Sequence, residues 1–343
     1  MDFRPFAAFL GLALAVVTTA LPARAQTAPA YTLKIATTAP EGTPWAKGIT
    51  DFKAQAETMA GGKLLVKPFL GGVLGDENET VQSCQRGQIQ GIGVSTGALA
   101  AVVPELGVVE LPYLFRNEAE ADFILDGIIL DAVEDALEAK GLVLGFWSEN
   151  GYRSFGTNYG FVKTPADLKG RKMRSQENPV HLEMYRALGA SPVPIPVTEV
   201  LTSLQTGVVD GYDNTVLFAS AAQWMSATKY YTVSNHIYQP AAIVYNKAWF
   251  DGLPADVQAA VKSPRLGLVT QMRAEIRALT PILLSNLSAM DVQVYTQTAA
   301  ERAAFEGPAK TARDAWLKSA SAAEKALYNK IVAGLDTYRK AHP

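Results

Sequence analysis

The chain has 343 residues, 48% of them hydrophobic, and its 31 lysines and arginines nearly balance 33 aspartates and glutamates. This length favours two domains, because one domain usually holds roughly 100–200 residues. A formal net charge of −2 without blocks of like charge argues against a nucleic-acid-binding protein, which would show a basic face or stripe. Cys84 is the single cysteine, so no internal disulfide can form.

The N-terminus has the pattern of a secretory signal peptide. Arg4 precedes an apolar run over residues 6–17, and Ala23-Arg-Ala25 places small residues at a cleavage site. The apolar run is too short to span a bilayer. We therefore expect residues 1–25 to be removed near Ala25 and the mature, soluble protein to reach the periplasm. An uncleaved N-terminal anchor is the alternative interpretation.

The first half of the mature chain alternates between strand and helix patterns. Strands are predicted over residues 31–36, 64–69, 89–94 and 142–148, and helices over 44–59, 76–86 and 118–139. Such alternation is typical of an α/β fold with a largely parallel sheet.

At Glu149-Asn-Gly151 the chain is predicted to turn and to begin a second unit. Strands are expected over residues 153–157, 171–175, 193–196 and 208–212, and a strand over 241–246 returns toward the first unit. Helical patterns fill residues 254–290, interrupted by Pro264 and Pro281, and then 298–339. We expect this helical tail to brace the fold, with a homodimer contact through it as the alternative.

Two α/β units joined by two crossings predict a hinged cleft, and ligand pockets favour such domain interfaces. We assign residues 26–150 with about 240–280 to domain I. Residues 151–239 with part of 281–343 form domain II, which carries the C-terminal helices.

The leading candidate for a ligand contact is Arg174, at the C-terminal end of the predicted 171–175 strand. Asn178-Pro179 then begins a helix as N-cap and first-turn proline. In open α/β sheets ligands bind at this edge, and a guanidinium holds a carboxylate through two parallel hydrogen bonds. A surface arginine paired with Glu177 or Glu183 is the alternative.

Further candidates line the same expected cleft. Arg153 follows the crossing between units, so its side chain can enter the cleft; a hinge salt bridge to Glu149 is the alternative. Glu149 itself argues against a second ligand carboxylate at that end. Hydroxyl-bearing and aromatic side chains complete the set, although aromatic groups more often belong to a core: Thr38, Ser95, Trp147, Tyr152, Tyr212 and Phe218.

A catalytic interpretation starts from Gly93-Val-Ser-Thr-Gly97, which has the form of an α/β-hydrolase nucleophile elbow with Ser95 as nucleophile. Asp210 and His236 would follow in the required order, so an exported hydrolase is the second hypothesis. The glycine spacing over residues 91–97 is wrong for a dinucleotide fingerprint. One cysteine and three scattered histidines offer no metal-ligand cluster, so we expect neither metal nor cofactor.

Several stretches of the chain resemble the DctP-type solute-binding proteins of TRAP (tripartite ATP-independent periplasmic) transporters. They keep the family's order within residues 31–253 and are Leu111-Pro-Tyr-Leu-Phe115, Asn150-Gly-Tyr-Arg153, Asp167-Leu-Lys-Gly-Arg-Lys-Met-Arg174, Leu188-Gly-Ala-Ser-Pro192 and residues 198–211. The resemblance implies a type II-like two-domain periplasmic binding protein that closes over a small organic acid. It also implies delivery of the unchanged ligand to small and large membrane subunits. A receptor of the same fold that feeds a sensor is the alternative.

The resemblance also implies roles for single residues. The arginine that matches Arg174 grips the ligand carboxylate, the one that matches Arg153 assists, and Asn214 matches a ligand-binding asparagine. Two departures fall at this wall: Arg174-Ser-Gln stands where the family usually has Arg-Val-Pro, and Asp213-Asn-Thr where it has Glu-Asn-Pro. Both leave open a substrate other than the family's common one.

Overall fold

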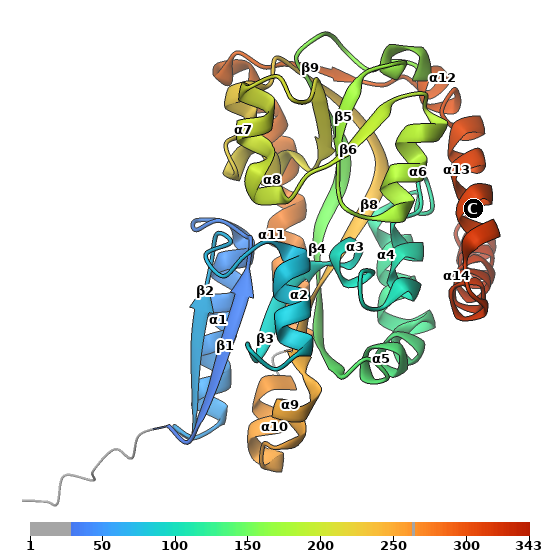
Figure 1. Cartoon of the computed structure of the whole chain (residues 1–343). Coiled ribbons are helices and arrows are strands. Elements are labelled where there is room, and N and C mark those ends of the chain that lie inside the picture. Colours follow the sequence, from blue (N-terminus) through green and yellow to red (C-terminus); the bar gives the residue numbers. More distant parts are fainter. Residues whose placement is uncertain (1–28, 263–264) are drawn as a thin grey trace, which may run out of the picture.

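A computed structural model describes residues 29–262 and 265–343, apart from the side chains of 265 and 266. Within them nine strands form one sheet in the order β2-β1-β3-β8-β4-β7-β5-β6, with β9 paired to β8 off this path (Figure 1). The strands are β1 Tyr31–Thr37, β2 Leu64–Phe69, β3 Gly91–Ser95, β4 Leu142–Thr157, β5 Lys172–Ser175, β6 Ser191–Pro194, β7 Gly211–Asn214, β8 Tyr230–Asn246 and β9 Gln293–Thr296. The predicted signal peptide, its cleavage site and Pro264 lie outside the described residues.

Two long antiparallel strands, β4 and β8, occupy the middle of this sheet. One end of β8 pairs with β3, and the opposite end of β4 pairs with β7. Parallel pairs extend the sheet on both sides, β1 with β2 and β3, and β5 with β6 and β7. Figure 1 shows these two strand groups as two lobes joined by the long strands. We call them the β1–β3 lobe and the β5–β7 lobe.

Helices cover the sheet, which confirms the α/β prediction. Several begin where the sequence provides a cap: Thr43 accepts a hydrogen bond from the Ala46 N–H with Pro44 in the first turn, and Asn178 accepts from the Val180 N–H before Pro179. The helices are α1 Pro44–Met59, α2 Glu77–Gln85, α3 Thr96–Leu99, α4 Glu118–Phe123, α5 Leu130–Glu138, α6 Pro179–Ala187, α7 Val200–Gln205, α8 Val216–Ala221, α9 Lys247–Asp251, α10 Ala255–Lys262, α11 Arg265–Asn286, α12 Ala299–Ala303, α13 Glu306–Ser319 and α14 Ala322–Ala341.

The predicted turn at residues 149–151 is wrong, because β4 runs straight through it. Glu149 pairs with Pro240 and Gly151 with Gln239, so Asn150 is the extra residue of a β-bulge. Gly151 adopts φ +96°, a conformation that costs glycine little. The residues that predicted a turn therefore form a bulge within one continuous strand.

Other helix and strand boundaries also differ from the predicted ones. The single helix predicted over residues 118–139 is divided by a π-helical turn at Ile124–Ile128, and Pro281 lies inside α11 without ending it. The strand predicted over 241–246 is the end of the longer β8, the strand predicted over 208–212 lies at Gly211–Asn214, and β9 was not predicted. Pairing with a neighbouring strand, which local sequence does not encode, sets these limits.

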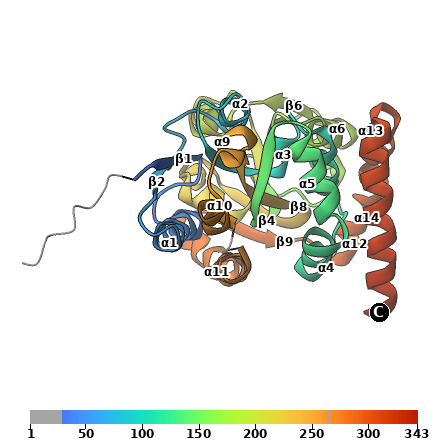
Figure 2. The ribbon, with the colours of Figure 1, turned by 90° about the horizontal axis from the view of Figure 1, so that it is seen from below.

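The C-terminal helices pack against the fold, as Figure 2 shows for α13 and α14 along one side of the molecule. Leu327, Ile331 and Leu335 are buried with α5 residues in one core cluster. At Gly334 an added Cβ would lie 2.7 Å from Ile124 Cδ1, so only glycine fits here without rearrangement. These contacts confirm the predicted brace. None of the helices among the described residues combines the length and apolar composition that crossing a bilayer requires.

Candidate functional site

A cavity lies between the two lobes, where the C-terminal ends of β1, β3, β5 and β7 meet the crossing strands. This is the edge at which open α/β sheets bind ligands. Its polar lining residues are Thr37, Thr38, Glu77, Ser95, Ser148, Asn150, Arg153, Arg174, Gln176, Asn214 and Gln239. Apolar side chains, among them Trp45, Ile49, Phe218 and Met272, complete the wall.

Arg174 lies buried in this cavity, near the end of β5. Its Nε and Nη2 both donate to the carbonyl oxygen of Ile195, at 2.9 and 2.7 Å. Neither Glu177 nor Glu183 pairs with it, because Glu177 accepts from Asn78 and Glu183 from Arg186. Burial lowers the pKa of Arg174 to about 10, and the nearby charge of Arg153 acts in the same direction. Among the described residues no carboxylate forms an ion pair with this guanidinium.

Arg153 is also buried, but its charge has a partner in Asp213 of β7. Its Nε donates to Asp213 Oδ2 at 2.6 Å, and its Nη1 donates to Gln239 Oε1 at 2.8 Å. Burial opposes ionisation of Asp213, but Arg153 and the His236 ring, 3.4 Å away, outweigh it and hold the pKa of this carboxyl well below its usual range. The alternative pairing of Arg153 with Glu149 is therefore wrong.

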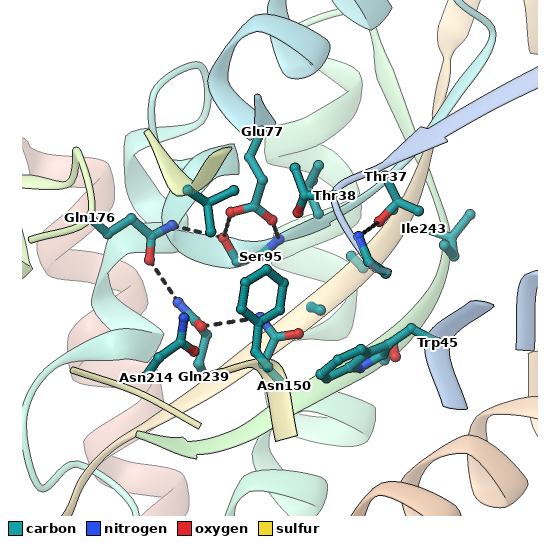
Figure 3. Close-up of a pocket in the computed structure, with 18 of the residues that line it drawn as sticks. Thr37, Thr38, Trp45, Glu77, Ser95, Asn150, Gln176, Asn214, Gln239 and Ile243 are labelled. Atoms are coloured by element: carbon teal, nitrogen blue, oxygen red, sulfur yellow. Dashed lines mark hydrogen bonds between the residues drawn. The ribbon is translucent and has the colours of Figure 1, made fainter. Parts of the chain in front are cut away.

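A chain of hydrogen bonds runs along the cavity wall from Glu77 to Asn150 (Figure 3). Glu77 accepts from the Ser95 N–H at 2.7 Å and from the Ser95 hydroxyl at 2.8 Å. Gln176 Nε2 donates to that hydroxyl at 2.8 Å, and Gln239 Nε2 donates to Gln176 Oε1 at 2.8 Å. Asn150 Nδ2 then reaches Gln239 Oε1 at 3.1 Å. This wall is consequently a fixed array of amides, a hydroxyl and one carboxylate.

The Glu77 carboxylate stands at the start of α2. Burial raises its pKa to about 7, and the charges of Asp76 and Glu110 add to the effect, although the hydrogen bonds from Ser95 oppose it. Glu110 behaves differently. Burial would raise the pKa of Glu110, but the bond to His181, at 2.6 Å, and a second to Thr96 outweigh it, so that its pKa is lowered.

The remaining wall combines aromatic rings with hydroxyl and amide groups. The rings of Trp45 and Phe218 lie 6.0 Å apart at 50°. Ser148 Oγ is buried and has no hydrogen-bond partner within the described part of the chain. A buried hydroxyl without a partner is costly, so a ligand that hydrogen-bonds to it would remove that cost.

Contacts across the cleft hold the two lobes together around the cavity. The Val197 N–H donates to Asp76 Oδ1 at 2.9 Å, and Asn78 Nδ2 donates to Glu177 Oε2 at 2.8 Å. Asn178 Nδ2 donates to the Gly97 carbonyl at 3.0 Å. The cleft is thus in a closed arrangement.

Six predicted site residues line the cavity: Arg174, Arg153, Asn214, Ser95, Thr38 and Phe218. The other predicted side chains lie elsewhere. Trp147 donates to the Leu125 carbonyl in the core, Tyr212 bonds to Thr228, Tyr152 reaches the Phe115 carbonyl, and Glu149 accepts from Arg277 and Tyr238. These four side chains are therefore not among those that line the cavity.

Sequence reasoning missed Trp45, Glu77, Ser148, Asn150, Gln176 and Gln239 as lining residues. For two of these six residues the sequence held a clue that they belong to the site. Gln176 is one of the departures noted after Arg174, and Asn150 opens the stretch that ends at Arg153. Glu77 had none, because an acidic residue in a first helical turn is ordinary.

The catalytic interpretation is wrong. Ser95 Oγ is bonded to Glu77, Gln176 and the Ala98 N–H, with no histidine beside it. His236 Nδ1 bonds to Ser234, and Asp210 accepts from the Lys172 N–H. The acid, histidine and serine therefore do not assemble.

A family model described as DctP, bacterial extracellular solute-binding protein, family 7, matches residues 35–319. A solute-binding protein of Verminephrobacter eiseniae is 38% identical over 220 residues, which are 64% of this chain and 66% of that protein.

Solved structures share the fold over most of the chain. The sugar acid binding protein DctPAm of Advenella mimigardefordensis, in complex with galactonate, matches at a TM-score of 0.84 and 28% identity over 92% of this chain and 99% of that one. A TRAP periplasmic solute-binding protein of Citrobacter koseri with bound D-glucuronate matches at 0.80 and 32%, over 86% and 98%. The predicted fold, with its long C-terminal helices, is confirmed.

Proposed function

Because this chain belongs to the DctP family of bacterial extracellular solute-binding proteins, we propose that it captures a small organic carboxylate for TRAP-type uptake. The observation that carries this proposal is Arg174, a cation buried in the cavity whose partner is a backbone carbonyl rather than a carboxylate. A buried charge without a counter-charge is unfavourable. A ligand carboxylate would supply that counter-charge.

Arg153 is unsuited to the same role, since Asp213 already balances its charge. It supports the site by holding Gln239 and Asp213 in place. Asn214, the residue after Asp213, offers an amide beside the cavity. We assign the carboxylate grip to Arg174 and the orientation of the ligand to Asn214 and the amide wall.

No reaction occurs in this account. The ligand selects the closed arrangement of the two lobes, and that arrangement docks to the small and large membrane subunits. We place the protein in the periplasm after cleavage near Ala25. The residue ranges assigned to domains I and II, and a homodimer through α13 and α14, stay predictions. A receptor that feeds a sensor remains the alternative, and uptake by membranes that carry the TRAP subunits distinguishes the two.

A calorimetric screen of the purified protein tests the carboxylate requirement. The probes are D-galactonate, D-glucuronate, D-erythronate and succinate, with galactitol as the control, because galactitol has the skeleton of galactonate without its charge. We expect saturable binding of at least one carboxylate and none of galactitol. Binding of galactitol as tight as that of galactonate, or binding of no carboxylate in a wider acid panel, would contradict the proposal.

A further inference from the structure

The charges in the cavity are unevenly paired. Three charged side chains line it: Arg153, Arg174 and Glu77. Arg153 is paired with Asp213, whereas Arg174 has no carboxylate partner and Glu77 no cationic partner among the described residues. One ligand carboxylate therefore balances the charge of Arg174. The ligand group that faces Glu77 must be compatible with the two oxygen atoms of its carboxyl group.

Hydrogen bonding makes the Glu77 end rich in acceptors. The N–H and O–H of Ser95 both donate to Glu77, and the two N–H groups of Gln239 donate to Gln176 and Glu110. A carboxylate has about four acceptor positions, of which Ser95 occupies two. What remains open on Glu77 itself is acceptor capacity, so a ligand group that contacts Glu77 must bring donors.

We propose that the ligand is a polyhydroxylated monocarboxylate and that Glu77 determines this specificity, accepting ligand hydroxyls and repelling a second carboxylate. The inference rests on the proposed function. Above its pKa of about 7 the Glu77 carboxyl group is ionised and only accepts hydrogen bonds, and two like charges in a water-poor cleft repel strongly. A ligand hydroxyl can donate a hydrogen bond to Glu77 and carries no charge, so it avoids both the missing donor and the repulsion.

The surroundings of Glu77 favour several hydroxyls over a single ammonium group. Ser148 Oγ is buried without a partner, and the amides of Asn150 and Gln176 lie on the same cavity wall. These neutral groups both donate and accept, so they exchange hydrogen bonds with hydroxyls at several positions along a ligand, whereas an ammonium can only donate. The rings of Trp45 and Phe218 suit the C–H faces of such a chain or ring.

Calorimetry at about pH 8, where Glu77 with its pKa of about 7 is mostly ionised, tests the inference with matched acid pairs. Each pair shares a carbon skeleton and differs by a second terminal carboxylate: D-galactonate with galactarate, D-gluconate with D-glucarate, and D-erythronate with meso-tartrate. We expect the wild-type protein to bind at least one monocarboxylate about tenfold or more tightly than its diacid. In Glu77→Gln that monocarboxylate should bind about tenfold more weakly, and the preference over the diacid should shrink or reverse.

Glu199→Gln is the matched control. It removes the same charge from an exposed residue between β6 and β7 that does not line the cavity, so both affinities should stay within about twofold of wild type. A melting curve of each variant checks the fold.

The outcomes separate this inference from the proposed function. If carboxylates bind but no monocarboxylate is preferred over its diacid, or Glu77→Gln leaves the preference unchanged, the role of Glu77 is wrong and the binding function stands. Tighter binding of an amino acid that depends on Glu77 would also overturn the inference. If no carboxylate binds, the proposed function itself fails.

Discussion

Replacing Arg174 by alanine removes the cation to which the proposed function assigns the ligand carboxylate. The guanidinium is buried, and its Nε and Nη2 are fixed on the Ile195 carbonyl. That anchoring leaves the Nη1 side of the planar fork available to a ligand. The substitution therefore deletes both a charge and a directed pair of donors.

The magnitude follows from this burial. Truncating one partner of a buried, hydrogen-bonded charge pair costs about 2–5 kcal/mol. At about 1.4 kcal/mol per tenfold change, the dissociation constant should rise roughly 30- to 4,000-fold. Arg174→Lys keeps the charge without the fork, so it should recover part of the loss.

Stability should change less than binding. Without the guanidinium the Ile195 carbonyl loses its donors, a cost of about 1–3 kcal/mol. Relief of the repulsion between Arg174 and Arg153, which helps to lower the pKa of Arg174, offsets part of it. The variant should fold, and its ligand-induced rise in melting temperature should disappear.

Isothermal titration of the carboxylate found in the screen measures the effect. Arg171→Ala is the control, because Arg171 is an exposed arginine of the same segment that lies over the Tyr159 ring. It should bind within about twofold of wild type. If Arg174→Ala binds within threefold of wild type while folded, Arg174 is structural and the carboxylate assignment fails.

Three further predictions concern pairing, chemistry and export. Asp213→Asn leaves Arg153 buried without its counter-charge and should lower the free energy of unfolding by about 3–5 kcal/mol. Because the folded pKa of Asp213 lies below the unfolded value near 3.8, this difference should be full at neutral pH and shrink as pH falls below that value, as urea titrations at several pH values would reveal. Ser95→Ala and wild type should hydrolyse p-nitrophenyl esters at the same background rate, and a rate lost in the variant would revive the hydrolase hypothesis. Mass spectrometry of periplasmic protein should find a chain that begins at or near Gln26, and an intact Met1 would refute cleavage.

Local patterns were sufficient for the parts of the fold that local chemistry controls. The caps at Thr43 and Asn178 mark the beginnings of α1 and α6 at the predicted residues. The middle of the sheet was harder, because β4 and β8 gain their length from pairing with each other over most of their residues. A strand that continues through Asn150 by a bulge has the same local sequence as one that turns there.

The site likewise contains residues that local sequence predicts and residues that it does not. Arg174 and Ser95 were predictable because strand ends in an α/β sheet converge on one edge. Gln239 and Glu77 were not, since the first lies inside a long strand and the second in an ordinary helical first turn. Only the closure of the two lobes around the cavity brings them into one hydrogen-bonded wall.

A crystal structure of the protein with its tightest-binding carboxylate shows whether Arg174 holds the ligand. We predict ligand density in the cavity between the two lobes, with a carboxylate oxygen about 2.7–3.2 Å from a guanidinium nitrogen of Arg174. Ligand density outside this cavity, or a carboxylate turned away from Arg174, would contradict it.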